Sequence, residues 1–310
     1  HLSTHLGAPA SAPRELMGIP TTVQEAIEEA AQVLGQAEIA LGQGTLNAYD
    51  EAAWLVLSAL GMPLDSDDEH LLTALPASQW QTIQSWLHRR TQERVPTAYL
   101  SGEAWLQGVP FHVDARSIIP RSLIAEVLAE GQLDAHVPER SARILDLCTG
   151  NGSLAVLCAM AWPWAQIDAI DISSDALDVA RLNVRRHGLS DRIHLIEGDG
   201  CSAACGTYDL VVCNPPYVNQ ASMLRLPPEF SHEPSLALAG GEDGMDFIRP
   251  MLHQLPKHLA PDGALVLEIG HEWDHFVHAF PSLNGLWLPT SAGDEQVVLL
   301  TQHDLMDLPS

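Results

Sequence analysis

The tetrapeptide Asn214-Pro215-Pro216-Tyr217 combines residue types that suit a planar amino group. An asparagine side chain offers a carbonyl acceptor, and a proline keeps its backbone carbonyl while its ring stiffens the turn. The carbonyls of Asn214 and Pro215 can therefore accept both hydrogens of an –NH₂ group while the ring of Tyr217 stacks on its plane. The tetrapeptide is the candidate substrate site, with Asn214, Pro215 and Tyr217 as its catalytic residues. An ordinary stiff turn is the alternative for such a tetrapeptide in isolation.

A second candidate is a glycine turn that reads I-L-D-L-C-T-G-N-G. Gly150, Gly152 and Ala155 satisfy the pattern G-x-G-x-x-[GA], and glycines let a ligand approach the backbone closely at a helix N-terminus. Asp171 follows at the spacing of a carboxylate that binds the two hydroxyls of a ribose. Both a dinucleotide and a nucleoside without pyrophosphate fit this pattern. Asp146 favours the second, because a carboxylate repels phosphate but attracts a cationic amino-acid group.

A third motif competes with these two. His271-Glu272-Trp273-Asp274-His275 matches H-E-x-x-H, the zinc-and-base arrangement of a zinc hydrolase. The 15 histidines of the chain raise the chance of such a match. The segment also occupies the place of the helix after the fifth strand, which predicts an exposed helix with Trp273, Phe276 and Val277 towards the sheet. We therefore predict no metal site.

The second half of the chain must position these motifs. Short β-type runs alternate there with helical stretches, which predicts a mostly parallel, doubly wound α/β sheet. The expected strands cover residues 144–148, 167–172, 193–196, 210–213 and 264–269, and the expected helices cover 152–161, 175–187 and 245–259. Two further runs, 286–288 and 296–301, predict a terminal antiparallel hairpin. Both turns follow a strand directly, so we expect them at one edge of the sheet.

The first half of the chain has a different pattern. Helical periodicity predicts a bundle over residues 21–41, 48–60, 68–75 and 78–95. Alternation around Gly108 and Pro110 predicts a β-hairpin within residues 98–114, and Pro120 is expected to open a short helix over 121–130. The predicted division is a disordered tail or tag remnant (1–20), a helical substrate-docking domain (21–96), a β-hairpin linker (97–118) and a catalytic domain (119–310).

The charge of the chain excludes some partners. Forty acidic residues against fifteen basic ones leave a net charge of −25, and Lys257 is the only lysine. Such a surface repels a free nucleic-acid backbone and attracts a basic protein, although a simply solvated acidic surface is equally compatible. No apolar run approaches the roughly 20 residues of a membrane span, and no signal peptide is visible. The five cysteines form no C-x-x-C pair, which favours reduced thiols and a cytoplasmic location.

Taken in order, these motifs resemble those of class I S-adenosylmethionine-dependent methyltransferases, and specifically the HemK-like protein-glutamine methyltransferases. The matching pieces are the D-L-C-T-G-x-G turn, Asp171, Glu197-Gly198-Asp199 and the Asn-Pro-Pro-Tyr turn. Cys148, the run Ile119-Pro120-Arg121, His232-Glu233-Pro234 and the run from Gly42 to Glu51 resemble the branch that methylates the third protein of the large ribosomal subunit. Asn151 and Gly200 depart from the family pattern.

The resemblance implies a seven-stranded class I methyltransferase sheet with an N-terminal α-helical domain and a β-hairpin linker. It implies that Asp146, Thr149 and Gly150 approach the methionine part of S-adenosylmethionine, that Asp171 holds the ribose and that Asp199 lies near the adenine. The full implied set of cofactor residues is Asp146, Leu147, Cys148, Thr149, Gly150, Gly152, Asp171, Ile172, Asp199, Gly200 and Asn214. The implied substrate residues are Asn214, Pro215, Pro216 and Tyr217.

The implied reaction is methyl transfer to the side-chain amide of a glutamine in a basic ribosomal protein. Four alternatives stay open. Glutamine methylation of release factors uses the same chemistry, and a DNA adenine methyltransferase uses the same turn but needs a basic recognition segment. A non-catalytic ribosome assembly factor and a zinc hydrolase built on His271, Glu272 and His275 are the other two. No free nucleic acid, membrane or metal is expected as a partner.

Overall fold

The computed structural model describes residues 18–309 and divides them into two compact units. The helical unit contains residues 18–38 and 47–93, and the sheet unit contains residues 39–46 and 94–309. Most of the tail expected over residues 1–20 lies outside the described residues. The helical unit is not continuous in sequence, because residues 39–46 belong to the sheet unit.

Four helices form the helical unit, and they are α1 (Val23–Gln36), α2 (Ala48–Ala59), α3 (Asp68–Leu71) and α4 (Ala77–Thr91). Thr22 caps α1 by accepting a hydrogen bond from the backbone N–H of Glu25. Arg90 of α4 forms a buried ion pair with Glu51 of α2, with Nε 3.0 Å from Oε1. All four predicted helices are present, but α3 and α4 end at Leu71 and Thr91 and not at residues 75 and 95. The helix α1 ends at Gln36 and not at residue 41, because the chain leaves the bundle there to join the sheet unit.

A seven-stranded sheet with the order β5-β4-β3-β6-β7-β9-β8 is the centre of the second unit. Its strands are β3 (Arg143–Leu147), β4 (Gln166–Asp171), β5 (Ile193–Glu197), β6 (Tyr208–Cys213), β7 (Leu259–Glu268), β8 (Leu286–Thr290) and β9 (Gly293–Thr301). The first five are parallel, whereas β9 is antiparallel to both β7 and β8. The predicted doubly wound sheet and its terminal hairpin are confirmed.

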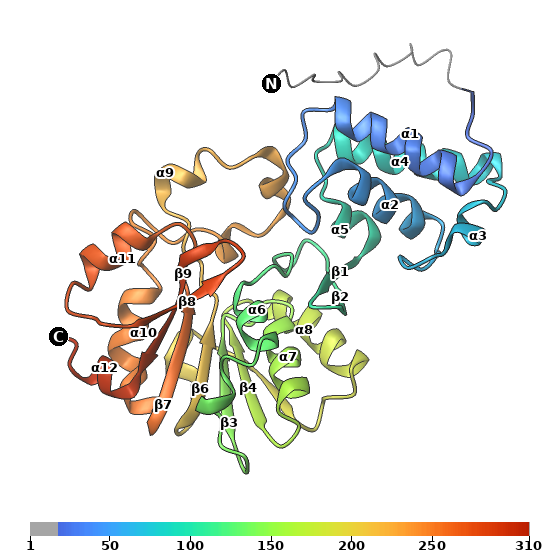
Figure 1. Cartoon of the computed structure of the whole chain (residues 1–310). Coiled ribbons are helices and arrows are strands. Elements are labelled where there is room, and N and C mark those ends of the chain that lie inside the picture. The colour runs from blue at the N-terminus through green and yellow to red at the C-terminus, as the bar shows by residue number, and fades with distance from the viewer. Residues whose placement is uncertain (1–17, 310) are drawn as a thin grey trace, which may run out of the picture. The chain divides into compact units, whose positions relative to one another are not determined.

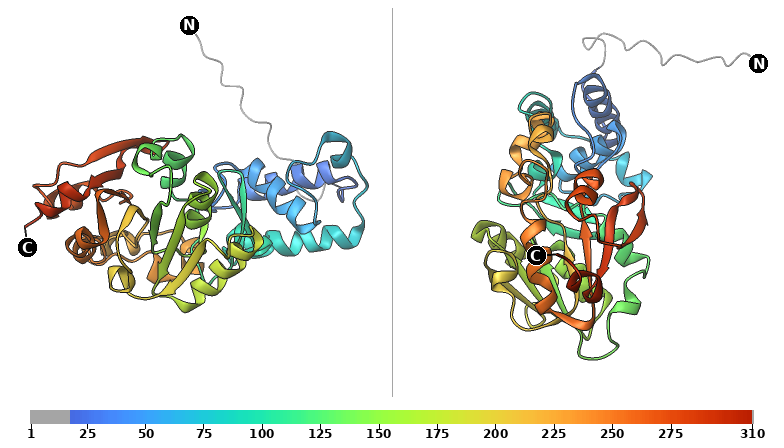
Figure 2. Two further views of the ribbon diagram at one scale, coloured as in Figure 1. Left: turned by 90° about the horizontal axis from the view of Figure 1, so that it is seen from below. Right: turned by 90° about the vertical axis from the view of Figure 1, so that its left-hand side faces the viewer.

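Helices cover both faces of the sheet, as Figures 1 and 2 show. One layer contains α6 (Ile124–Ala129), α7 (Ser153–Ala161) and α8 (Ser174–Arg186), and the other contains α10 (Ile248–Gln254), α11 (Trp273–Ala279) and α12 (Gln302–Met306). Successive strand residues point to opposite faces, so Ile144 belongs to the first core and Leu145 to the second. Strands buried on both faces explain the continuous apolar runs in the sequence.

The segment before the sheet contains α5 (Thr97–Ser101), β1 (Glu103–Leu106) and β2 (Val109–His112), and the segment after β6 contains α9 (Gln220–Met223). The hairpin is confirmed, but the expectation of strand from residue 98 is wrong. Pro96 opens a helical turn, which Gly102 ends at φ +73°. The expected helix start at residue 121 is also wrong, because α6 begins at Ile124. No helix within residues 18–309 is long and apolar enough to span a membrane.

Candidate active site

The two predicted turns lie next to each other because their strands are neighbours. β3 and β6 are parallel, and Leu147 is paired with Cys213, the last residue of each strand. The glycine turn therefore leaves the sheet beside Asn214. Asp171 and Glu197 are paired in the same way where β4 and β5 end. The sheet thus brings the predicted cofactor and substrate residues to one carboxyl-terminal edge, where open α/β sheets bind ligands.

The glycine turn has a left-handed backbone that brings α7 close to α8. Gly152 has φ +82°, and a Cβ atom there would lie 3.2 Å from Cβ of Ala180. A side chain at this position would therefore push α8 away. Cys148 also has a positive φ of 60°, which is uncommon for a residue other than glycine. The turn thus has left-handed backbone at Cys148, Gly150 and Gly152, directly after β3.

Asp146 is the buried acid of this turn. Its Oδ2 accepts a hydrogen bond from Thr149 Oγ1 at 2.7 Å, while its buried Oδ1 has no hydrogen-bond partner among the described residues. Burial raises the pKa of Asp146 to about 7, and the nearby Asp171 charge acts in the same direction. A buried carboxylate oxygen without a partner is costly, and a cationic group would offset that cost. The site thus fits the ammonium of an amino-acid ligand.

Asp171 lies at the end of β4 and orders the neighbouring backbone. Its Oδ2 accepts from Gly150 N at 2.8 Å and its Oδ1 accepts from Ser173 N at 2.9 Å. A carboxylate has about four acceptor sites, so Asp171 retains capacity to accept from a hydroxyl. The next residue, Ile172, is 52% exposed, so an apolar surface adjoins the carboxylate. These neighbours suit a nucleoside.

Asp199 and Gly200 follow β5 at the same edge. Asp199 is exposed, and Gly200 lies under the ring of Phe247, since a Cβ at Gly200 would be 3.4 Å from Phe247 Cε2. A Cβ at position 200 would only make van der Waals contact with this ring, but the φ of +55° at Gly200 favours glycine there.

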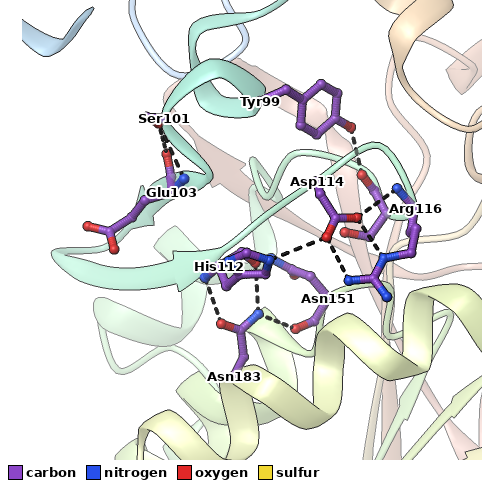
Figure 3. A network of polar contacts seen from close by, with 9 residues as sticks. Tyr99, Ser101, Glu103, His112, Asp114, Arg116, Asn151 and Asn183 are labelled. Atoms are coloured by element: carbon purple, nitrogen blue, oxygen red, sulfur yellow. Dashed lines mark hydrogen bonds and ion pairs between the residues drawn. The ribbon is translucent and has the colours of Figure 1, made fainter. Parts of the chain in front are cut away.

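A buried asparagine ties the glycine turn to the end of β2 (Figure 3). Nδ2 of Asn183 donates to the backbone oxygens of Asn151, at 2.9 Å, and His112, at 3.0 Å. Its Oδ1 accepts from His112 N at 2.7 Å. Asn183 was not predicted as a site residue. Its position in a helix does not indicate that its side chain binds the backbone of His112 and Asn151. The backbone of Asn151 makes this contact and its Oδ1 accepts from Ser153 N, whereas its buried Nδ2 has no hydrogen-bond partner among the described residues.

Asn214 presents the acceptor that its motif predicts. Its Oδ1 is buried and has no hydrogen-bond partner among residues 18–309. Pro215 is buried beside it and has no N–H to compete for that oxygen. A buried carbonyl oxygen without a donor costs free energy, so this atom is suited to accept from a ligand.

Tyr217 is fixed from several sides. Its hydroxyl donates to Oε2 of Glu268 at 3.1 Å, and burial together with the Glu268 charge raises the pKa of Tyr217 above its ordinary value. A Cβ atom at Gly270, which has φ +57°, would lie 2.3 Å from Cε2 of the ring. Only glycine therefore fits at position 270. The hydrogen bond to Glu268 and the close approach of Gly270 thus both restrict the ring.

Buried carboxylates around the turn were not predicted from the sequence. Glu268 accepts from Ser122 Oγ at 2.8 Å and from Leu123 N at 2.7 Å. Glu233 binds the guanidinium of Arg121 through both oxygens, at 2.7 and 3.1 Å, and accepts from Ile119 N. Arg121 and Ser122 are used in these contacts, which is why α6 starts only at Ile124. An acid that ends an apolar strand, as Glu268 does, is a signal that could have identified it.

The H-E-x-x-H segment does not form the zinc-and-base arrangement. The helix α11 begins at Trp273, so His271 precedes it and the two histidines do not share a helix face. Glu272 is buried, where it accepts from Asn219 Nδ2 at 2.6 Å and contacts Nδ1 of His275. No group of three His, Cys, Asp or Glu residues in the described part of the chain could hold a metal ion. Glu272 instead anchors the segment that follows Tyr217.

Comparison with known proteins shows the family of the chain. The family model described as Methyltransferase small domain matches residues 125–239. A protein of Bordetella pertussis named Ribosomal protein uL3 glutamine methyltransferase is 51% identical over 286 residues, which cover 92% of this chain and 96% of the relative. Proteins of the same name from Burkholderia pseudomallei and Neisseria meningitidis serogroup A are each 44% identical and cover 92% of this chain and 95% of the relative. On this similarity along nearly its whole length, the chain belongs to the family of ribosomal protein uL3 glutamine methyltransferases.

Proposed function

We propose that this protein transfers a methyl group from S-adenosylmethionine to the side-chain amide nitrogen of a glutamine in the large-subunit ribosomal protein uL3. The observation that carries the proposal is the pair of buried acceptors, Asp146 Oδ1 and Asn214 Oδ1, at the ends of two adjacent strands. One suits a cationic amino-acid group and the other suits an amide N–H. A cofactor and an amide substrate can therefore meet between them.

The residues of the glycine turn would hold S-adenosylmethionine. Asp146 would pair with its ammonium, Asp171 would accept hydrogen bonds from the ribose hydroxyls, and Ile172, Asp199 and Gly200 would lie along the adenine. When bound, the cofactor supplies an electrophilic methyl group on a sulfonium. The carboxylates of Asp146 and Asp171 also complement the positive charge of such a ligand.

The Asn-Pro-Pro-Tyr turn would hold the substrate amide. An amide nitrogen is a poor nucleophile because its lone pair is delocalised into the carbonyl. Acceptance of its two N–H hydrogens by Asn214 Oδ1 and the Pro215 carbonyl favours positive charge on the nitrogen and directs its lone pair. Tyr217, held by Glu268, supports the amide plane. Positioning and fixed dipoles then do most of the catalysis.

No general base is needed before the methyl group is transferred, because the nitrogen becomes acidic only afterwards. Within residues 18–309, the carboxylates of Glu268 and Glu272 are already engaged by Tyr217 and Asn219. We therefore propose that the departing proton goes to water.

The choice of uL3 rests on the names of the relatives and on charge. A net charge of −25 suits a basic ribosomal protein and disfavours free DNA. We further propose that the helical unit docks the substrate and that the reaction takes place in the cytoplasm, where ribosomal proteins are made.

Mass spectrometry tests this function. Purified protein is incubated with S-adenosylmethionine and, separately, uL3, a release factor and double-stranded DNA. The proposal predicts a gain of one methyl group on a glutamine of uL3 and none on the other two. Methylation of the release factor alone would contradict the substrate, and methylation of DNA alone would contradict the class of reaction.

A further inference from the structure

Residues 39–46 are separated by sequence from the sheet unit but are bound to it by two buried carboxylates. Ala40 N donates to Glu229 Oε2 at 2.7 Å, and Gln43 Nε2 donates to Glu233 Oε2 at 2.9 Å. Glu229 is also paired with Arg94, with distances of 2.9 and 3.0 Å. The segment is therefore held in place by charge-assisted hydrogen bonds and does not merely connect two helices.

The side-chain amide of Gln43 uses its Nε2 in a hydrogen bond but not its Oε1. The side chain is 8% exposed, and its buried Oε1 has no hydrogen-bond partner among the described residues. The orientation of the amide is fixed, because a carboxylate such as Glu233 only accepts and must face Nε2. A buried acceptor without a donor costs free energy, because it has lost its hydrogen bonds to water. Such an atom is suited to accept a hydrogen bond from a ligand.

The partner of Gln43 also connects it to the active site. The same Glu233 carboxylate accepts from Ile119 N and binds Arg121. Ile118, the residue before Ile119, lies beside Gly150, where a Cβ atom would be 3.6 Å from its Cγ2. The charges of Arg121 and Glu233 both act on the pKa of Tyr217. Gln43 is thus joined through one carboxylate to both the cofactor turn and the substrate turn.

The segment also offers surface to a larger partner. Leu46 is 86% exposed, and Leu41 is exposed as well, whereas Gln43 between them is buried. A polypeptide that lay along the segment would find apolar side chains at its ends and a single acceptor in its middle. Exposed apolar side chains on both sides of the acceptor suit an extended polypeptide better than a small molecule such as the cofactor.

We propose that residues 39–46 are part of the substrate site, and that Gln43 Oε1 accepts a hydrogen bond from a backbone N–H of the polypeptide that carries the target glutamine. This inference rests on the proposed function and adds to it a residue that binds the protein substrate and not the cofactor.

Two substitutions distinguish the role of the Gln43 donor, Nε2, from that of its acceptor, Oε1. Gln43→Lys keeps a donor towards Glu233 but has no acceptor, and Gln43→Met removes both. Steady-state methylation of uL3 should show a KM for uL3 raised about three- to tenfold in both variants, with kcat nearly unchanged, as expected for the loss of one hydrogen bond. The affinity for S-adenosylhomocysteine, measured by calorimetry, should not change, which also shows that the variants are folded.

Gln166→Ala is the matched control, because Gln166 is an exposed glutamine at the opposite, amino-terminal end of β4. Its KM for uL3 should equal that of the wild type. A raised KM in Gln43→Met alone would overturn the inference, since it would show that only the contact with Glu233 matters. An active wild type with both variants unchanged would overturn it as well. A wild type that does not methylate uL3 would instead overturn the proposed function, and this inference with it.

Discussion

The hydroxyl of Tyr217 donates a hydrogen bond to Oε2 of Glu268, 3.1 Å away, at the point where β7 ends. The other oxygen of Glu268 accepts from Ser122 Oγ and Leu123 N. These two donors and the Tyr217 hydroxyl are all uncharged. Burial raises the pKa of Glu268. The tyrosine of the substrate turn thus takes its orientation from a buried acid that the sequence places far away.

The first prediction concerns this pair. Tyr217→Phe keeps the ring but leaves Glu268 Oε2 without its donor, so it should lower the free energy of unfolding by about 1–3 kcal/mol. Adding Glu268→Gln should restore part of that loss, because an amide carries no charge to bury. Chemical denaturation of the two single variants and the double variant measures the coupling. Strictly additive changes would show that the hydroxyl and the carboxylate do not interact.

The second prediction follows from the pKa of Asp146, which burial raises from 3.8 to about 7. The folded protein holds this proton more tightly than the unfolded chain, so the free energy of unfolding should fall as the pH rises from about 4 to about 7. A bound ammonium favours the carboxylate, and cofactor binding near pH 6.5 should therefore release a proton. Calorimetry in buffers of different ionisation enthalpy detects that release. Asp146→Asn should abolish it, and an unchanged release would assign the proton to another group.

The third prediction is that the H-E-x-x-H segment plays no part in catalysis. His275 contacts Glu272, but its side chain is 47% exposed, so His275→Ala should leave methyl transfer near the wild-type rate. His278→Ala is the matched control on the same helix. Elemental analysis and activity after chelation complete the test. Stoichiometric zinc that is lost together with activity would support the zinc hydrolase alternative.

Much of the sheet was predictable because its signals are local. An apolar run that ends in a glycine or proline turn marks both a strand and its carboxyl end, and this holds for Asp146 and Asn214. Element ends were less predictable where distant partners decide them. The chain leaves α1 at Gln36 because residues 39–46 bind Glu229 and Glu233. Similarly, Arg121 stays outside α6 because it pairs with Glu233.

The predicted site residues all lie at the same edge of the sheet, but the residues that hold them were not foreseen. Asn183, Glu233 and Glu268 act on backbone or side chains 32 to 190 positions away. No periodicity or spacing rule encodes which buried acid meets which donor. The choice depends on how the sheet and its two helix layers pack, which the sequence pattern predicts only in outline.

Asn214→Ala tests the central claim most directly. Its Oδ1 is proposed to accept an amide hydrogen that matters most in the transition state, so its loss should depress turnover by about 10²–10³. The affinity for S-adenosylhomocysteine should change little, because Asp146 still pairs with its ammonium and Asp171 with its ribose. Asn214→Asp keeps an acceptor and should retain part of the activity. The measurement is tritiated methyl transfer to uL3 under single-turnover conditions, alongside calorimetry. A large loss of transfer with intact binding is the predicted result, and transfer at the wild-type rate would contradict the account.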